Sequence, residues 1–187
     1  AALGVDAAFS VEELDKKMPE LLANRNALYY PFATHAQLPA QIEQWLAAVR
    51  AQARSGVRCP QALHDVTAVL DELRLQKDVV EIDLMRHAGN ISAAAHIRAM
   101  QASARMLRAG EDAREFHLEA QLLHSFRQAG SAAPAYTSIV AAGANACVLH
   151  YRAGNAPLRA GELVLIDAAC EWQNYASDIT RTFPANG

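Results

Sequence analysis

The chain has 187 residues, 52% of them hydrophobic, and a formal net charge of −3 at pH 7. The length allows one full domain or parts of two, and the hydrophobic content excludes a largely disordered chain. The acidic balance argues against a nucleic-acid-binding surface, and no apolar run approaches the ~20 residues of a membrane span. No signal-peptide pattern opens the sequence, and Cys59, Cys147 and Cys170 lack CxxC spacing, so we expect free thiols in a cytoplasmic protein.

The first part of the chain is predicted to consist of helices and one short strand. Ser10 and Glu13 have the spacing of a capping box, and a helical apolar pattern follows them. Residues 28–32 read as a strand stopped by proline, and residues 41–54 as a second helix. We expect Pro60 to open a third helix. Its apolar stripe comprises Leu63, Val66, Val69, Leu70 and Leu73.

A charged segment, residues 74–77, marks a candidate domain boundary. Asp78 and Glu81 beyond it have capping-box spacing, and small and apolar residues then predict a long helix to about Leu107. Residues 112–129 form the next predicted helix. Because each helix is followed by a glycine, both ends are well marked in the sequence.

Residues 134–150 are expected to carry strands, with a turn at residues 143–145. A loop then leads into a predicted β-hairpin. Its first strand, residues 163–166, is a continuous apolar run typical of a strand buried on both faces. Its return strand, residues 175–183, is rich in aromatic and β-branched residues. Helices followed by antiparallel strands indicate an α+β fold.

Two aspartates lie on the predicted hairpin. If its turn centres between Trp172 and Gln173, Asp167 lies directly opposite Asp178, with their Cβ atoms roughly 5 Å apart. Two like charges in this position repel each other, and a cation between them removes the repulsion. Two-metal hydrolytic sites hold their ions roughly 3.5–4 Å apart, a span that paired carboxylates can serve. The alternative is a pair of solvated aspartates near a turn.

The hairpin also resembles a known family. The stretch LVLIDAACEWQNYASDITRTFP, residues 163–184, resembles the first metal-ligand segment of the Xaa-Pro aminopeptidases (aminopeptidase P) and, less closely, of prolidase. Both belong to the pita-bread metallopeptidase family. The likeness continues upstream through IVAAGANACVLHY, residues 139–151. It is most specific in SDITRTFP, residues 177–184, combined with the 11-residue step from Asp167 to Asp178. Small residues, Ala146, Ala169 and Ser177, stand where the family usually has glycine-like positions.

The resemblance implies an arrangement of domains. Residues 1–73 look like the C-terminal part of the family's α/β N-terminal domain. Residues 78–187 look like the first half of the pita-bread catalytic domain. In the family the remaining metal ligands, a histidine and two glutamates, come from the second half. We therefore expect them to be supplied by a companion chain or by the remainder of a longer polypeptide.

The resemblance also implies roles for three residues, and strand alternation indicates a role for a fourth, Thr180. Asp167 is expected to bind one ion and Asp178 to bridge two, most simply Mn²⁺, with Zn²⁺ or Co²⁺ as other possibilities. A hydroxide held between the ions would attack the scissile carbonyl. His150 would stabilise the charge that develops on the carbonyl oxygen, the alternative being a structural imidazole at a strand end. Thr180 shares a strand face with Asp178 and is expected to hydrogen-bond a ligand carboxylate.

The expected activity is release of the N-terminal residue from peptides with proline in second position. The resemblance also implies a homo-oligomer. Two alternatives stay open: a prolidase restricted to dipeptides, and a non-catalytic binding module that has lost its metal. Arg181 is expected to form a salt bridge with a neighbouring acid. Five other histidines fall in predicted helices without metal-ligand spacing and are interpreted as structural: His64, His87, His96, His117 and His124.

Overall fold

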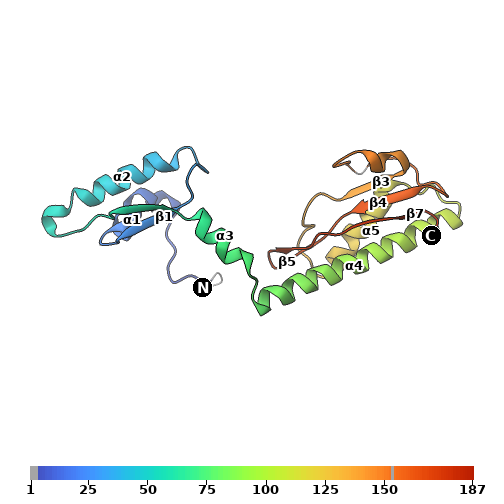
Figure 1. Ribbon diagram of the computed structural model, residues 1–187, viewed down its shortest axis with the longest axis horizontal. Coiled ribbons are helices and arrows are strands. Elements are labelled where there is room, and N and C mark those ends of the chain that lie inside the picture. The colour runs from blue at the N-terminus through green and yellow to red at the C-terminus, as the bar shows by residue number, and fades with distance from the viewer. Residues whose placement is uncertain (1–3, 153) are drawn as a thin grey trace. The chain divides into compact units, whose positions relative to one another are not determined.

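The computed structural model describes residues 4–152 and 154–187, so the first three residues of the expected N-terminal part lie outside the described residues. The chain divides into two compact units, Ala1–Gln76 and Lys77–Gly187 (Figure 1). No helix among the described residues is both long and apolar enough to cross a membrane. All three cysteines are free thiols.

The first unit combines helices with two short parallel strands. Its elements are η1 (Val11–Glu13), α1 (Leu14–Leu22), β1 (Ala27–Tyr30), α2 (Leu38–Arg50), η2 (Ala53–Ser55), β2 (Ala62–Asp65) and α3 (Thr67–Leu75). Strands β1 and β2 pair with Leu28 beside Leu63. Helices α1 and α2 enclose a small core of Leu22, Ile42, Trp45, Leu46 and Val49. Helix α2 begins and ends a few residues earlier than predicted.

The predicted third helix is wrong in its first half. Residues 62–65 form β2 because their backbone groups pair with β1, a long-range pairing that local apolar spacing does not reveal. The helix begins at Thr67, whose amide donates to Asp65 Oδ1 at 2.9 Å. His64 therefore lies in a strand, where its ring stacks on Tyr29 with the centroids 4.8 Å apart.

The predicted capping box at Ser10 is also wrong. The Ser10 hydroxyl donates to the Glu12 carboxylate and leaves the Glu13 amide to the Ser10 carbonyl. By contrast, the capping box at Asp78 is confirmed. Asp78 Oδ1 accepts from the Glu81 amide at 2.9 Å, and Glu81 Oε2 accepts from the Asp78 amide at 2.7 Å.

The second unit layers two helices against an antiparallel sheet (Figure 1). Its elements are α4 (Val79–Arg108), α5 (Glu115–Gln128), β3 (Ile139–Ala142), η3 (Gly143–Cys147), β4 (Leu163–Asp167), β5 (Glu171–Trp172), β6 (Tyr175–Ala176) and β7 (Thr180–Pro184). The sheet order is β3-β4-β7, and β5 and β6 form a separate ribbon at the tip of the hairpin. The predicted α+β layering is confirmed.

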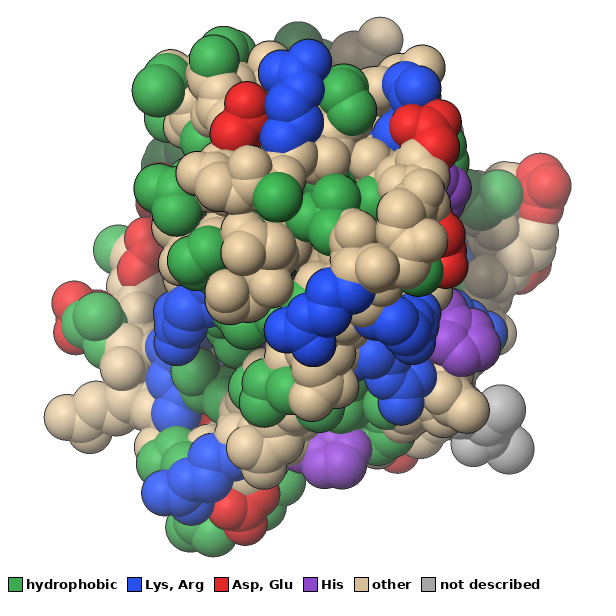
Figure 2. Space-filling view, turned by 90° about the vertical axis from the view of Figure 1, so that its right-hand side faces the viewer, with side chains coloured by type: hydrophobic (Ala, Val, Ile, Leu, Met, Phe, Trp, Pro, Cys, Tyr) green, Lys and Arg blue, Asp and Glu red, His purple; other side chains and the backbone are tan. Residues whose placement is uncertain are grey.

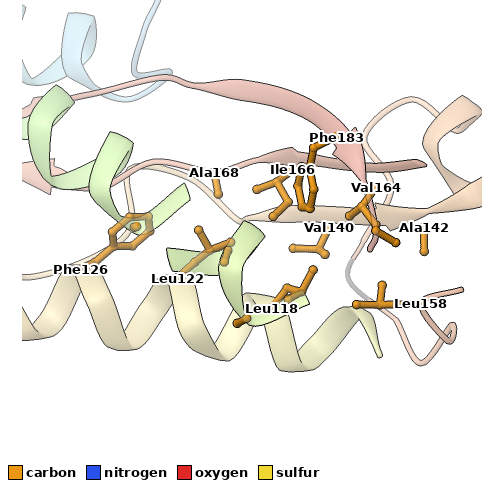
Figure 3. Close-up of a cluster of buried hydrophobic side chains, with 14 of the residues drawn as sticks. Leu118, Leu122, Phe126, Val140, Ala142, Leu158, Val164, Ile166, Ala168 and Phe183 are labelled. Atoms are coloured by element: carbon orange, nitrogen blue, oxygen red, sulfur yellow. The ribbon is translucent and has the colours of Figure 1, made fainter. Parts of the chain in front are cut away.

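The core of this unit lies between the sheet and α5. Leu118, Leu122 and Phe126 point from the helix toward the strands, as Figure 3 shows. On β4, Val164 and Ile166 are fully buried against them, whereas Leu163 on the other face is 53% exposed. The prediction that β4 is covered on both faces is therefore wrong for the described residues. By strand alternation Asp167 shares the open face with Leu163.

The turn predicted at residues 143–145 is confirmed, but among the described residues no strand follows it up to residue 150 as expected. β3 stops at Ala142, and residues 143–147 form a 3₁₀ turn. His150 follows in another turn, where its φ of +52° is in the left-handed region that side chains rarely adopt. His150 is thus presented by a loop and not by a strand end.

Helix α4 ends with two arginines in its last turn, Arg105 and Arg108, which suit the negative end of the helix dipole. This end of the helix lies at the right of Figure 1, the side that faces the viewer in Figure 2. Basic side chains gather near the middle of that face, among hydrophobic and uncharged ones (Figure 2).

A buried hydroxyl network ties α4 to the hairpin. Ser92 is fully buried, and its Oγ accepts from the Cys170 amide at 2.9 Å. The Ser177 hydroxyl lies 2.8 Å from Ser92 Oγ and 2.8 Å from the Cys170 carbonyl oxygen. Ser177 therefore links the hairpin to the helix through hydrogen bonds of its hydroxyl group.

We expect Ser92→Ala to lower the free energy of unfolding by about 1–3 kcal/mol, because the buried Cys170 amide loses its acceptor. The loss should appear as a lower urea midpoint of the full-length protein. Ser125→Ala is the matched control, since the Ser125 hydroxyl donates to the Gln121 carbonyl of its own helix and to no other described residue. Equal midpoints for the two variants would contradict the role assigned to Ser92.

Candidate active site

The hairpin brings the two aspartates together in a register that differs from the predicted one. Trp172 pairs with Tyr175, so the turn is Gln173-Asn174, with φ values of +48° and +68°. Positive φ at both central residues is the requirement of a type I′ turn. The turn centre therefore lies one position later than predicted, and the expected direct opposition of the two aspartates is wrong.

In the observed register Asp167 pairs with Thr180. The pairing continues through the Ala168 amide, which donates to the Ile179 carbonyl at 3.2 Å. Asp178 thus lies opposite Ala169, one diagonal step from Asp167 on the same face of the hairpin. A shift of two residues preserves the face, because side chains alternate with a period of two.

Tyr136 joins the two carboxylates. Its hydroxyl lies 2.5 Å from Asp167 Oδ1 and 2.8 Å from Asp178 Oδ1. Since both contacts share one oxygen atom, the two carboxylate oxygens lie well within the ~8 Å reach of diagonal neighbours. Tyr136 is held there by pairing of its segment with the hairpin: the Ala135 amide donates to the Ala169 carbonyl at 2.8 Å.

The hydroxyl of Tyr136 cannot satisfy both acceptors. Burial, and then the hydrogen bonds to the two carboxylates, raise the pKa of Tyr136, so the hydroxyl keeps its proton at neutral pH. One proton donates to one carboxylate at a time. The other carboxylate faces a second negative charge with no donor from Tyr136, which is an arrangement that a cation would stabilise.

A pocket of about 410 Å³ opens over the carboxylates. Its lining includes the two aspartates, Tyr136, His150 and Arg152. His150 is exposed, and it also borders an adjoining pocket of about 290 Å³ that reaches Asp167 and Thr180. The structure therefore brings His150, Asp167 and Asp178 to one pocket. Two side chains that can donate hydrogen bonds, those of His150 and Arg152, border the same pocket as the two carboxylates.

Two further predicted contacts differ in the structure. Thr180 lies opposite Asp167, but its hydroxyl makes no hydrogen bond within the part of the chain that the structure describes; the contact expected of Thr180 is made by Tyr136. Arg181 forms no salt bridge with a described residue, so that prediction is wrong. Its guanidinium donates to the Thr180 carbonyl at 2.7 Å. By alternation Arg181 lies on the helix side of the strand.

The donor set fits part of a metal site. Two aspartate carboxylates on one face are hard oxygen ligands suited to ions such as Mn²⁺. Within residues 4–152 and 154–187 no group of three or more His, Cys, Asp or Glu is arranged to hold an ion. Asp167 and Asp178 would thus contribute two of the ligands, and further ligands would have to come from residues outside the described set.

A third carboxylate, Glu115, lies outside the pocket and was not anticipated from the sequence. It is fully buried, at the first residue of α5, and it accepts hydrogen bonds from five donors. The donors belong to Ala142, Asn145, Tyr151, Gly154 and Ala156, at 2.9 to 3.3 Å. Burial acts to raise the pKa of Glu115, but these hydrogen bonds outweigh it and hold the pKa below the usual value.

Comparison with known proteins agrees with the geometry of a metallopeptidase site. Residues 83–187 match the model of metallopeptidase family M24, which is more than half of the chain. The chain belongs to metallopeptidase family M24.

Within this family the chain is similar to Xaa-Pro aminopeptidases along its whole length. It is 39% identical over 185 residues to the enzyme of Escherichia coli and 42% identical over 185 residues to that of Haemophilus influenzae. In each case the match covers 99% of this chain. It covers only 41% and 39% of the two relatives, so the chain spans about two fifths of their length.

Solved structures give the same result. The aminopeptidase PepP of Pseudomonas aeruginosa superimposes with a TM-score of 0.87 at 42% identity, over 100% of this chain and 41% of that one. Aminopeptidase P from E. coli in its low-pH form gives 0.85 at 38% identity, over 98% of this chain and 40% of that one. These structures have the pita-bread fold, and the chain has the fold of part of them. A zinc-substituted form of the E. coli protein is among the similar structures.

Proposed function

We propose that this chain carries part of the active site of a metal-dependent aminopeptidase that removes the N-terminal residue from peptides with proline in second position. The observation that carries the proposal is the pair of carboxylates of Asp167 and Asp178, joined by Tyr136 in a pocket that His150 borders. The proline preference is extended from the names of the relatives.

In this proposal the side chains divide the work. Asp167 and Asp178 hold divalent ions, most simply Mn²⁺, and Tyr136 orients the carboxylates by hydrogen bonding. When bound, the ions supply the Lewis acidity that polarises the scissile carbonyl and makes a hydroxide available at neutral pH. His150 donates an N–H to the carbonyl oxygen as negative charge develops there. Arg152 adds positive charge to the same pocket.

The three free thiols support a cytoplasmic location.

The proposal is tested by peptide hydrolysis with the full-length protein. Three substrates are compared: a tripeptide with proline second, the same tripeptide with alanine second, and the dipeptide that ends in proline. We expect Mn²⁺-dependent release of the first residue from the proline tripeptide and much slower cleavage of the alanine peptide. Cleavage of the dipeptide alone would favour a prolidase. No cleavage of any of them with Mn²⁺, Zn²⁺ or Co²⁺ would refute the proposal.

Tyr136→Phe should weaken metal binding and activity by about 10- to 100-fold, the range for partners that orient metal ligands. The variant removes the hydroxyl oxygen that contacts both carboxylates and leaves the ring in place. Calorimetric titration with Mn²⁺ measures the effect. Tyr29→Phe is the control, since Tyr29 is an exposed tyrosine of the first unit. An unchanged affinity in Tyr136→Phe would contradict the orienting role.

A further inference from the structure

The segment that presents His150 has little packing of its own. Val148 is 55% exposed and Leu149 is 87% exposed, and His150 follows them in a left-handed backbone conformation. Its backbone forms a turn, in which the Tyr151 amide donates a hydrogen bond to the Val148 carbonyl at 3.3 Å. Since few hydrophobic contacts with the described residues hold Val148–His150 in place, we look to the residues on either side for what fixes this segment.

Both ends converge on one carboxylate. Before His150, the Ala142 amide and the Asn145 side chain each donate to Glu115 Oε1 at 2.9 Å. After it, the Tyr151 hydroxyl donates to Glu115 Oε2 at 2.9 Å, and the Gly154 amide at 3.2 Å. Residues 142–152 and 154–156 are therefore held from both sides by a single buried anion. Bonds to an ionised acceptor are stronger than neutral ones.

Tyr151 connects Glu115 to the residues that border the pocket. Its side chain is directed to Glu115, and its hydroxyl also accepts from Asn145 Nδ2 at 3.0 Å. The residues on either side of it, His150 and Arg152, both border the pocket over the aspartates. Fixing the tyrosine thus fixes the two neighbours that face the pocket.

Glu115, Tyr151 and Gly154 pack closely around these hydrogen bonds. A Cβ atom at Gly154 would lie 2.7 Å from the Tyr151 hydroxyl and 3.3 Å from Glu115 Oε2. The carboxylate itself is fixed by α5, where the Glu115 amide donates to the Ala156 carbonyl at 3.1 Å and the positive end of the helix dipole favours the negative charge.

From these contacts we propose that Glu115 is a positioning residue of the peptidase site: through Tyr151 and the amides around it, Glu115 holds His150 at the carboxylate pocket. This inference rests on the proposed function for its catalytic consequence. The ordering of residues 142–152 and 154–156 by Glu115 does not depend on that function, and it can be measured separately.

The test compares Glu115→Gln, Tyr151→Phe and wild type in the full-length protein. Glu115→Gln keeps the shape of the side chain but loses its negative charge. The NH₂ group of the glutamine would also face hydrogen-bond donors, from which it cannot accept. We expect kcat on a proline-second tripeptide to fall by about 10- to 100-fold, the cost of a misplaced catalytic group, with KM little changed. Tyr151→Phe should lower kcat in the same direction. Glu119→Gln, one turn further along α5, is the control and should leave kcat unchanged.

A double-mutant cycle with His150→Ala separates positioning from general stability. If Glu115 acts by holding His150, Glu115→Gln should cost little more once His150 is absent. A cost that is equal in both backgrounds would overturn the proposal. Should Glu115→Gln fail to fold, the same cycle with Tyr151→Phe decides.

Hydrogen exchange supplies the readout that does not need activity. Amide exchange across residues 142–156 should quicken in both variants and stay unchanged in Glu119→Gln. If wild type cleaves no Xaa-Pro peptide, the proposed function fails, and the exchange data still decide whether Glu115 orders the segment. Unchanged exchange in both variants would overturn the inference.

Discussion

Replacing Asp178 with asparagine in the full-length protein is expected to reduce hydrolysis of a proline-second tripeptide by more than about 100-fold. Loss of an outer partner of a metal ligand already costs about 10- to 100-fold, and a direct ligand should cost more. The substitution replaces an anion with a neutral amide of the same shape. Mn²⁺ affinity, followed by calorimetry, should fall together with activity.

Asp83→Asn is the matched control for this experiment. Asp83 is an exposed aspartate on α4, and its contact is an ion pair with Arg86 at 3.2 Å. Exposed pairs of this kind contribute little, so both activity and Mn²⁺ affinity should stay at the wild-type level. Wild-type hydrolysis by Asp178→Asn would show that the carboxylate is not a metal ligand of the peptidase site.

Phe126→Ala is expected to produce the largest loss of stability, about 3–5 kcal/mol, which is typical of removing a buried phenylalanine from a packed core. Phe126 is 1% exposed and points from α5 toward the sheet, as seen in Figure 3. The cost combines lost burial of the ring with the cavity that remains. A lower urea midpoint and lower melting temperature of the full-length protein would show it.

Phe116→Ala on the same helix is the control, because Phe116 is 42% exposed. Its replacement should cost far less, since its ring already contacts water over much of its surface. If the two variants lost equal stability, the core would not lie on the face of α5 that carries Leu118, Leu122 and Phe126.

Features set by neighbouring residues were the ones predicted best. The start of α4 depends on Asp78 and Glu81, three residues apart, and the reciprocal bonds expected from that spacing are present. Such a cap needs only residues of one helical turn, although the same spacing at Ser10 and Glu13 forms no box, because the Ser10 hydroxyl donates to Glu12 instead. The boundary between β2 and α3 was missed for the opposite reason, because pairing of Ala62–Asp65 with β1 outweighs the local helical pattern.

The hairpin shows the limit of register prediction. Asn-Gly or Asp-Gly usually marks a two-residue turn, but here the turn is Gln173-Asn174, inside a polar break that allows more than one centre. The predicted partner of Asp167, Asp178, is two residues away from the observed partner, Thr180. A shift of two residues leaves both aspartates on one face. Their proximity was therefore correctly anticipated, although the partner of Asp167 was not.

The polar supports of the site could not be read from the sequence. Glu115 stands in the first turn of an amphipathic helix, where an acid usually lies in water and complements the helix dipole. Its five donors are 27 to 41 residues away, and only the tertiary structure brings them to it. Tyr136 likewise contacts Asp167 and Asp178 across 31 and 42 residues of chain.

The most direct test of the central claim, that Asp167 and Asp178 are metal ligands, is anomalous diffraction from crystals of the full-length protein grown with Mn²⁺. Data collected on either side of the manganese absorption edge locate the ions without reference to activity. We expect an anomalous peak in contact with both carboxylates, and its loss in Asp178→Asn. Manganese peaks that lie elsewhere, with neither aspartate in contact with an ion, would contradict it.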